Sequence, residues 1–223
     1  MAQATTEAIQ LSNTGCERFA AGDLTGALNA YRAALYMVQA HHEVVVMGPP
    51  NLPADASDES TSLGISAMES SCVSANYDEP FVYERALVFR HVLPETQDGA
   101  ATFCGVVVFN MALIFDLRSK MANNSPSKYK ALQLYEAATD LFSKTSPRVD
   151  FDSIIAVVCN NKARIYFELS YFKDCEHELQ RLRQYLALTE DSRNKNDFVA
   201  KDDVEGMLLN LLLLWPPVSA HAA

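Results

Sequence analysis

The sequence has few basic residues and few glycines, and each shortage argues against a class of function. Lys and Arg number 18 against 28 Asp and Glu, so the net charge is −10. Because neutralising phosphates requires a basic face, this balance argues against nucleic acid and anionic membranes as the main partner. The eight glycines form no phosphate-binding loop, and neither a GxSxG nor an HExxH motif is present. We therefore expect no enzyme activity and no cofactor; a nonlocal active site, which leaves no motif, is the alternative.

Cysteine and histidine are scarce and scattered. The five cysteines are odd in number and lack the spacing of a disulfide framework, and three of them lie in helical patterns where Cys serves as a small apolar residue. Cys175 and His177 are two positions apart on an expected helix, so they point different ways and form no catalytic pair. His41 and His42 have only Glu43 nearby, which is too little for a metal site. The pattern predicts no metal and favours a reducing compartment.

No stretch of the sequence is expected to cross a membrane. Met207 to Trp215 stands out as apolar, but it contains Asn210 and stops before Pro216, far short of the ~20 residues that a bilayer requires. We interpret it as a buried terminal helix. The first ten residues have no basic segment and no apolar run, so they are not typical of a secretory signal. These features favour a cytoplasmic location.

What the sequence does have is a strong helical period between Leu11 and Leu35. The pattern is that of two amphipathic helices that meet at Gly22 and Asp23. The small residues that allow close approach are Gly15, Ala27 and Ala34, and the large ones between the helices are Leu11, Phe19, Leu28, Tyr31 and Leu35. This stretch predicts a helical hairpin.

The same pattern recurs twice, with an asparagine at the same place each time. Counted from Asn13, small residues follow after 2, 14 and 21 positions and an aromatic after 18. From Asn161 the same offsets meet small or apolar residues, and from Asn110 they do so after a delay of seven residues between Met121 and Lys128. The residues at these offsets are Gly15, Ala27, Tyr31 and Ala34; Ala112, Ala131, Tyr135 and Ala138; and Ala163, Cys175, Leu179 and Leu182. The spacing indicates three repeated hairpins, with an enlarged loop in the second.

At these residues the chain resembles the tetratricopeptide repeat family, in which helix-turn-helix units of about 34 residues stack on one another. The first unit carries the resemblance most fully, through Leu11, Gly15, Gly22-Asp23, Ala27, Tyr31 and Ala34. The resemblance implies an all-α fold, a right-handed α-α superhelix of three hairpins. It also implies that the first helix of each hairpin lines a concave face.

The whole chain, 1–223, is expected to form one such domain. Its parts are repeat 1 at 3–40, an insertion at 41–101, repeat 2 at 103–145, repeat 3 at 150–188, and a capping helix at 197–215 that covers the last repeat. Within the insertion, β-branched and aromatic residues predict strands at about 43–47 and 81–90 that pair into a ribbon. Between them, 51–80 has six acidic residues and no Lys or Arg, so we expect a disordered loop.

A cluster of basic residues surrounds the second hairpin. Its members are Arg118, Lys120, Lys128, Lys130, Lys144 and Arg148. We interpret the cluster as a solvated face, because an electrostatic footprint normally comes with a basic domain. The alternative is that the acidic loop folds over this face or over the groove and screens it.

The repeated asparagines are the candidate binding site. An Asn amide offers both a donor and an acceptor that match a peptide backbone, and Asn13, Asn110 and Asn161 would stand in register on the concave face. The resemblance implies an asparagine ladder, which in this family grips the main chain of an extended peptide independently of its sequence. The alternative is that each Asn bonds the backbone of the neighbouring unit. Either use satisfies a buried amide, so both stay open.

Residues one turn away on the same helices complete the expected groove. They are Ser12, Cys16 and Phe19 in the first unit, Phe109, Leu113 and Asp116 in the second, and Asn160, Arg164 and Phe167 in the third. This lining argues against the family's chaperone-tail clamp, which grips a terminal carboxylate with charge-assisted bonds. That clamp has Lys and Asn at the places of Ser12 and Cys16. It has Lys and Arg at the places of Val157 and Asn161, so only Asn110 matches; Arg164 is still placed to take an acidic side chain.

We expect a non-catalytic interaction module or scaffold that holds an extended peptide or a partner helix in the concave groove. The expected partner is a protein or peptide, not nucleic acid or a membrane. One alternative is a structural or assembly subunit that uses its convex face or its C-terminal helix. The other is an enzyme with a nonlocal site. A repeat fold fixes a surface and leaves the identity of the partner open.

Overall fold

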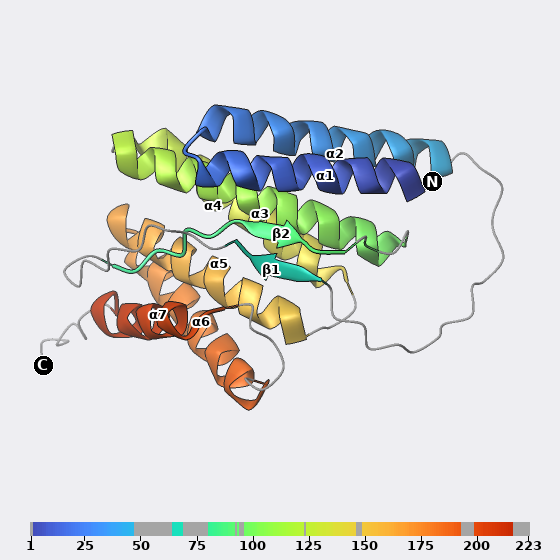
Figure 1. The fold of residues 1–223 in the computed structure, drawn as a ribbon. Helices are drawn as coiled ribbons and strands as arrows, with labels where there is room; N and C mark the ends of the chain where they lie inside the picture. Colours follow the sequence, from blue (N-terminus) through green and yellow to red (C-terminus); the bar gives the residue numbers. More distant parts are fainter. Residues whose placement is uncertain are drawn as a thin grey trace, which may run out of the picture.

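The computed structural model of the chain is mostly helical and describes residues 2–46, 64–68, 80–91, 93, 96–122, 124–145, 149–192 and 199–215. Figure 1 shows three helical hairpins followed by a single helix. The helices are α1 (Ala2–Ala20), α2 (Leu24–Val46), α3 (Gln97–Ala122), α4 (Ser125–Ser143), α5 (Val149–Glu168), α6 (Phe172–Ser192) and α7 (Lys201–Leu213), and the strands are β1 (Ile65–Ala67) and β2 (Leu87–Phe89). The all-α class expected from the sequence is confirmed, with one small two-stranded sheet.

The first hairpin forms where the small residues predicted it. Gly22 adopts a positive φ of 79° between α1 and α2, a conformation that glycine adopts without strain. The carboxylate of Asp23 then caps α2 by accepting a hydrogen bond from the Gly26 N–H at 2.8 Å. Further along, a Cβ atom on Gly15 would lie 2.5 Å from the Tyr31 ring. The two helices therefore touch at the glycine, as the spacing indicates.

The second hairpin corrects one expectation. We expected the seven extra residues to enlarge the loop at 121–128, but α3 continues to Ala122 and α4 begins at Ser125. Part of the extra length therefore extends α3. Asn124 caps α4 by accepting from the Ser127 N–H at 2.8 Å, and Pro126 stands in the first turn, where its missing N–H has no cost. Good capping and good helix formers on both sides leave little chain for a loop.

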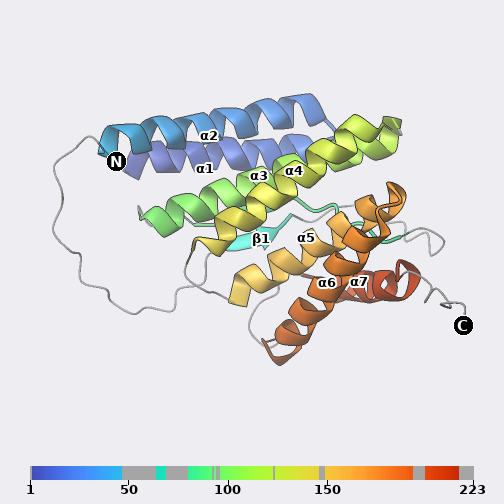
Figure 2. The ribbon, with the colours of Figure 1, turned by 180° about the vertical axis from the view of Figure 1, so that it is seen from behind.

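The helices form two layers. Figure 1 shows α1, α3, α5 and α7 on one face, and Figure 2, the view from behind, shows α2, α4 and α6 covering the other. Among the described helices, α3 alone is long and apolar enough to cross a membrane by length and composition, and 67% of its most apolar window is buried inside the protein. Burial of this kind is typical of a central helix that is apolar on all sides.

The insertion differs from its prediction in two ways. Residues 43–46 continue α2 and do not form a strand, because β propensity is weak and yields to helical context. The strand that pairs with β2 is instead β1, antiparallel, with Ile65 opposite Phe89 and Ala67 opposite Leu87. β1 lies within the segment 51–80 that we expected to be disordered throughout. The rest of that segment, apart from Gly64, Met68 and Pro80, lies outside the described residues.

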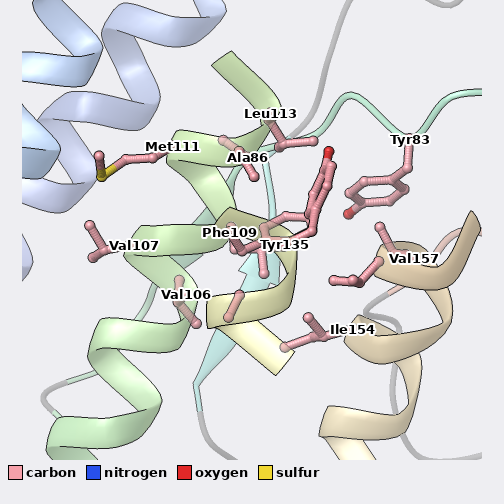
Figure 3. Close-up of a cluster of buried hydrophobic side chains, with 14 of the residues drawn as sticks. Tyr83, Ala86, Val106, Val107, Phe109, Met111, Leu113, Tyr135, Ile154 and Val157 are labelled. Atoms are coloured by element: carbon pink, nitrogen blue, oxygen red, sulfur yellow. The ribbon is translucent and has the colours of Figure 1, made fainter. Parts of the chain in front are cut away.

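Residues 80–90, which we call the strap, cross the face formed by α1, α3, α5 and α7. Only 87–89 are a β-strand; 81–86 have no assigned element, so the predicted strand at 81–90 is confirmed in part. Figure 1 shows the strap stretched between the α1–α4 half and the α5–α7 half of the molecule. Figure 3 shows Tyr83 beside Phe109, Tyr135 and Val157, from α3, α4 and α5. The strap is thus part of the core.

Candidate functional site: an asparagine ladder that holds the strap

Four asparagines each form two hydrogen bonds with one residue of the strap. In every pair the Asn Oδ1 accepts from the backbone N–H, and the Asn Nδ2 donates to the backbone C=O of the same strap residue. The pairs, with the N–H bond first, are Asn210 with Phe81 (2.8 and 2.7 Å), Asn161 with Tyr83 (3.0 and 2.9 Å), Asn110 with Leu87 (2.8 and 2.8 Å) and Asn13 with Phe89 (3.0 and 2.8 Å). We call these four residues the asparagine ladder.

The ladder fixes the direction and the orientation of the strap. Each asparagine of the ladder is one rung. From Phe81 to Phe89 the rungs come from α7, α5, α3 and α1, so the strap passes these helices in that order. All four held residues are odd-numbered, so one edge of the stretched backbone faces the ladder, as the two-residue period of extended chain requires. No rung faces Arg85. At that position the guanidinium pairs with Asp203 of α7 at 3.1 Å.

Cys16 adds a further bond to the middle of the strap. Its Sγ donates to the Leu87 carbonyl at 3.2 Å and accepts from the Tyr31 hydroxyl at 3.3 Å. Burial raises the pKa of Cys16 to about 11, and the Tyr31 hydrogen bond opposes that rise. The side chain is therefore a neutral thiol at physiological pH, a donor and not a nucleophile.

A buried polar network supports the rung at Asn161. Its Nδ2 also donates to the Tyr135 hydroxyl at 2.9 Å, and that hydroxyl donates to Asp116 at 3.4 Å. Arg164 forms an ion pair with Asp116 and a second one with Glu168. Burial raises the pKa of Asp116, and Arg164 opposes that shift. The network joins α5 to α3 and α4 behind the strap, so it holds Asn161 in place.

The two rungs nearest the C-terminus are also tied to each other. Asn160 accepts from Asn210 Nδ2 at 2.8 Å and donates to Asn161 Oδ1 at 3.1 Å. It also donates to the Phe81 carbonyl at 3.3 Å. Each amide thus has several partners, which orients the rungs before a backbone is bound.

The side chains of the held residues sit in distinct places. The ring of Phe81 lies over Gly206 of α7, where a Cβ atom would overlap it. The ring of Tyr83 is 6.4 Å from that of Phe109, between centroids, and the Phe89 ring stacks on Phe103 at 5.2 Å with an interplanar angle of 18°. Leu87 is fully buried.

The three asparagines predicted from the repeat therefore do hold an extended backbone. That backbone is neither a neighbouring helical unit nor a separate peptide; it belongs to the chain's own insertion. Asn210 was missed as a rung. Its signal was present, because it is the one polar residue within the apolar stretch 207–215, and a buried amide there needs partners.

Of the other nine predicted groove residues, six lie at the strap or beside it. Cys16, Phe109 and Asn160 contact the strap, and Phe19, Leu113 and Asp116 line a small cavity beside residues 82–84. Ser12 is fully buried, and its hydroxyl has no hydrogen-bond partner within the described ranges. Phe167 is 37% exposed and its ring meets Phe172 instead. Arg164 already pairs with two carboxylates of its own chain, so the expectation that it takes an acidic side chain from a partner is wrong.

A second charged cluster lies away from the strap, beside a cavity of about 410 Å³ between α4, α5 and α6. The ammonium of Lys162 pairs with Glu136 and, at 2.7 Å, with Glu178, which also pairs with Arg181 at 3.1 Å. Burial and Glu178 raise the pKa of the neighbouring Cys159 thiol, which leaves it without nucleophilic character.

Cysteine and histidine form no reactive group elsewhere in the described part of the chain. Cys175 is fully buried while the His177 side chain is 67% exposed, so the two do point different ways. The side chains of His41 and His42 lie outside the described residues. Among the side chains that are described, no group of three His, Cys, Asp or Glu is placed to hold a metal ion.

No family model, no curated protein and no solved structure matches the chain. The tetratricopeptide resemblance therefore depends on the residues that carry it. The function of the site therefore follows from the ladder, the strap and the contacts of the strap's side chains.

Proposed function

We propose that the protein is a non-catalytic interaction module of tetratricopeptide type, a right-handed superhelix of three hairpins that binds an extended segment of a partner protein in its groove. The observation that carries the proposal is the asparagine ladder, which bonds twice to each of four residues between Phe81 and Phe89. These bonds go to the backbone, so any extended segment with N–H groups at the four positions can form them.

The strap occupies the place that the partner segment takes. It is stretched chain held on one edge by side chains, which is the way a groove binds a peptide rather than the way hairpins pack. Each such hydrogen bond contributes only about 0.5–1.5 kcal/mol net. A chain tethered at both ends gives up less freedom on binding than a free peptide, whose association costs about 4–15 kcal/mol. Partner binding therefore requires the strap to yield.

The proposal is tested with a full-length variant whose strap is weakened while its groove is untouched. Phe81→Ser and Arg85→Glu together remove the ring over Gly206 and place a carboxylate against Asp203. A labelled peptide with the sequence of residues 80–91 is then titrated in trans, with fluorescence anisotropy as the readout. We expect saturable binding that weakens about tenfold when Asn13→Ala is added.

The matched control is Asn29→Ala in the same background. Asn29 is exposed on α2, so its removal should leave peptide binding unchanged. Circular dichroism must show equal helicity for all variants. Absence of peptide binding, or binding that ignores the loss of Asn13, refutes the groove as a peptide site.

A second candidate function is assembly through α7. This helix exposes Leu208, Leu212 and Leu213, at 43%, 79% and 48%, and contacts between exposed leucines are typical of helix–helix interfaces. Leu212→Glu distinguishes the two functions. If assembly is the function, sedimentation velocity should show that the substitution abolishes a larger species while the peptide titration is unaffected. A monomer at all concentrations before the substitution removes this candidate for self-assembly.

A further inference from the structure

We propose that the strap is a built-in competitor, and that the partner segment that replaces it carries the strap's own side-chain pattern. That pattern has one defined residue at every second position: aromatic, aromatic, basic, leucine-sized and aromatic. In the strap these positions are held by Phe81, Tyr83, Arg85, Leu87 and Phe89. The segment runs with its N-terminal end at α7 and its C-terminal end at α1. This inference depends on the proposed function and adds to it the chemistry of the partner and the reason that the free groove is closed.

Two residues of α7 contact the first aromatic position. Asn210 holds the backbone of Phe81, and Gly206, one turn earlier on the same helix face, receives its ring. Because Gly206 has no side chain, the ring lies against the helix backbone. A helix tolerates glycine at a cost of up to ~1 kcal/mol relative to alanine. The surface at Gly206 therefore accommodates a flat aromatic ring.

The basic position is set by Asp203. Its side chain is 4% exposed, one oxygen pairs with Arg85 at 3.1 Å, and the other accepts from the Ala200 N–H at 3.1 Å. Burial raises the pKa of Asp203, and Arg85 opposes that rise. A buried carboxylate that loses its cation is strongly unfavourable. A segment that displaces the strap must therefore supply a cation at the same place.

The last two positions are apolar. Leu87 is fully buried next to Asn110 and Cys16, and Phe89 stacks on Phe103 near the other end of the groove. Both are odd-numbered, as are the aromatic and basic positions before them. Between them, Ala86 is buried, and Val82, Glu84 and Val88 are partly buried, as Phe81 and Arg85 are. The alternation lies in the contacts instead: the ladder bonds and the aromatic ring contacts are all made by odd-numbered residues. Contacts to alternate side chains are how a stretched segment gains specificity beyond its backbone bonds.

The strap competes because it is covalently attached. Tethering raises the effective concentration of a ligand to roughly millimolar, so a free segment of equal fit is excluded until the strap is released. Emptying the groove would leave Asn110 and Asn161, both buried, without their backbone partners. Exchange of one segment for another avoids that cost. β1 pairs with β2, so it is expected to leave with the strap.

Three labelled peptides titrated against full-length proteins test the inference. One has the strap sequence, one has the same residues shuffled so that no aromatic keeps its position, and one has Glu at the basic position. The proteins are the wild type, the strap-weakened variant Phe81→Ser/Arg85→Glu, and that variant with Gly206→Ala. The single substitution Arg85→Glu, at a partly exposed site, replaces the double variant if the latter loses helicity.

We expect the strap-sequence peptide to bind the strap-weakened variant at least about tenfold more tightly than the wild type. The shuffled peptide and the Glu peptide should each bind at least about tenfold more weakly. Gly206→Ala should weaken the strap-sequence peptide and the Glu peptide, which both keep the first aromatic residue, and should not weaken the shuffled peptide further. Equal binding to the wild type refutes the strap as a competitor. Equal binding of the shuffled peptide refutes the pattern and leaves the groove as a peptide site. Binding of no peptide refutes both the pattern and the proposed function.

Discussion

At the scale of single residues, Asn110 tests whether the ladder stabilises the fold. It is 1% exposed and holds both backbone groups of the fully buried Leu87. In Asn110→Ala the buried N–H and C=O of Leu87 each lose a hydrogen bond. Each loss lowers the free energy of unfolding by about 1–3 kcal/mol. We predict a loss of at least about 2 kcal/mol in the free energy of unfolding by urea. Asn29→Ala, on the exposed side of α2, should change it by less than about 0.5 kcal/mol.

Cys16 reports on strap opening. With a pKa of about 11, roughly one thiol in a thousand is ionised at pH 8, and the thiolate fraction rises about tenfold with each pH unit up to the pKa. We predict that iodoacetamide barely modifies Cys16 in the folded wild type at pH 8, and that Phe81→Ser/Arg85→Glu accelerates the reaction. Mass spectrometry of the tryptic peptides measures it. Cys175, buried on α6 with a pKa also raised by burial to about 11, is the internal standard; an equal rise there would mean general loosening.

The sequence contains enough information to identify three of the four rungs. Asn13, Asn110 and Asn161 recur at one place in a repeated pattern, and a recurring amide on a buried face needs a backbone-like partner. Their actual partner was not predictable in the same way. Asn13 and Phe89 are 76 residues apart and Asn210 and Phe81 are 129 apart, and periodicity within a short window carries no information on such pairings.

At the scale of elements, α7 and the strap are matched through Gly206. Gly206→Ala improves helix propensity by up to ~1 kcal/mol, but its Cβ overlaps the Phe81 ring. We predict that Gly206→Ala destabilises the wild type and stabilises a Phe81→Ala background, where the ring is gone. Urea unfolding of the four proteins in this cycle measures the coupling. Additive effects of the two substitutions would contradict the contact.

The ion pair of Asp116 and Arg164 couples α3 to α5. Both side chains are almost fully buried, at 2% and 1%, so removing only the cation by Arg164→Met should cost about 3–5 kcal/mol. The double variant Asp116→Asn/Arg164→Met should recover most of that loss, because no unpaired charge is left. Thermal unfolding and urea titration of both variants check this order.

The Arg164→Met variant should also gain stability as the pH falls. Burial already raises the pKa of Asp116, and loss of the cation raises it further, so the folded state binds a proton that the unfolded state has released. Its free energy of unfolding should therefore decrease as pH rises between the unfolded and folded pKa values. A stability of Arg164→Met that does not change between pH 5 and pH 8 would contradict an ionisable, buried Asp116.

Local patterns predicted elements well where caps and glycines mark them. Gly22 and Asp23 gave the first turn, and the helices of all three hairpins were expected near their observed positions. The pattern failed at 43–46, where β-branched residues extend α2, and at 65–67, where a strand forms in an acidic, serine-rich segment. β1 is three residues long and exists through its pairing with β2, so its own composition gives little sign of it.

At the scale of the whole molecule, the strap joins the two halves of the fold. It is held by α1 and α3 on one side of Arg85 and by α5 and α7 on the other. Four of the seven described helices therefore hold a segment that the chain supplies itself. A peptide-binding role requires this segment, and not the helices that hold it, to yield.

Amide hydrogen exchange along the strap, followed residue by residue by NMR, tests the ladder most directly. We predict that the N–H groups of Phe81, Tyr83, Leu87 and Phe89, which donate to the four asparagines, exchange slowly in the wild type. In Arg85→Glu they should lose protection together, while the amides at the centre of α3 keep theirs. If these four amides exchange at the rate of an unfolded peptide in the wild type, the ladder does not hold the strap and the groove is open.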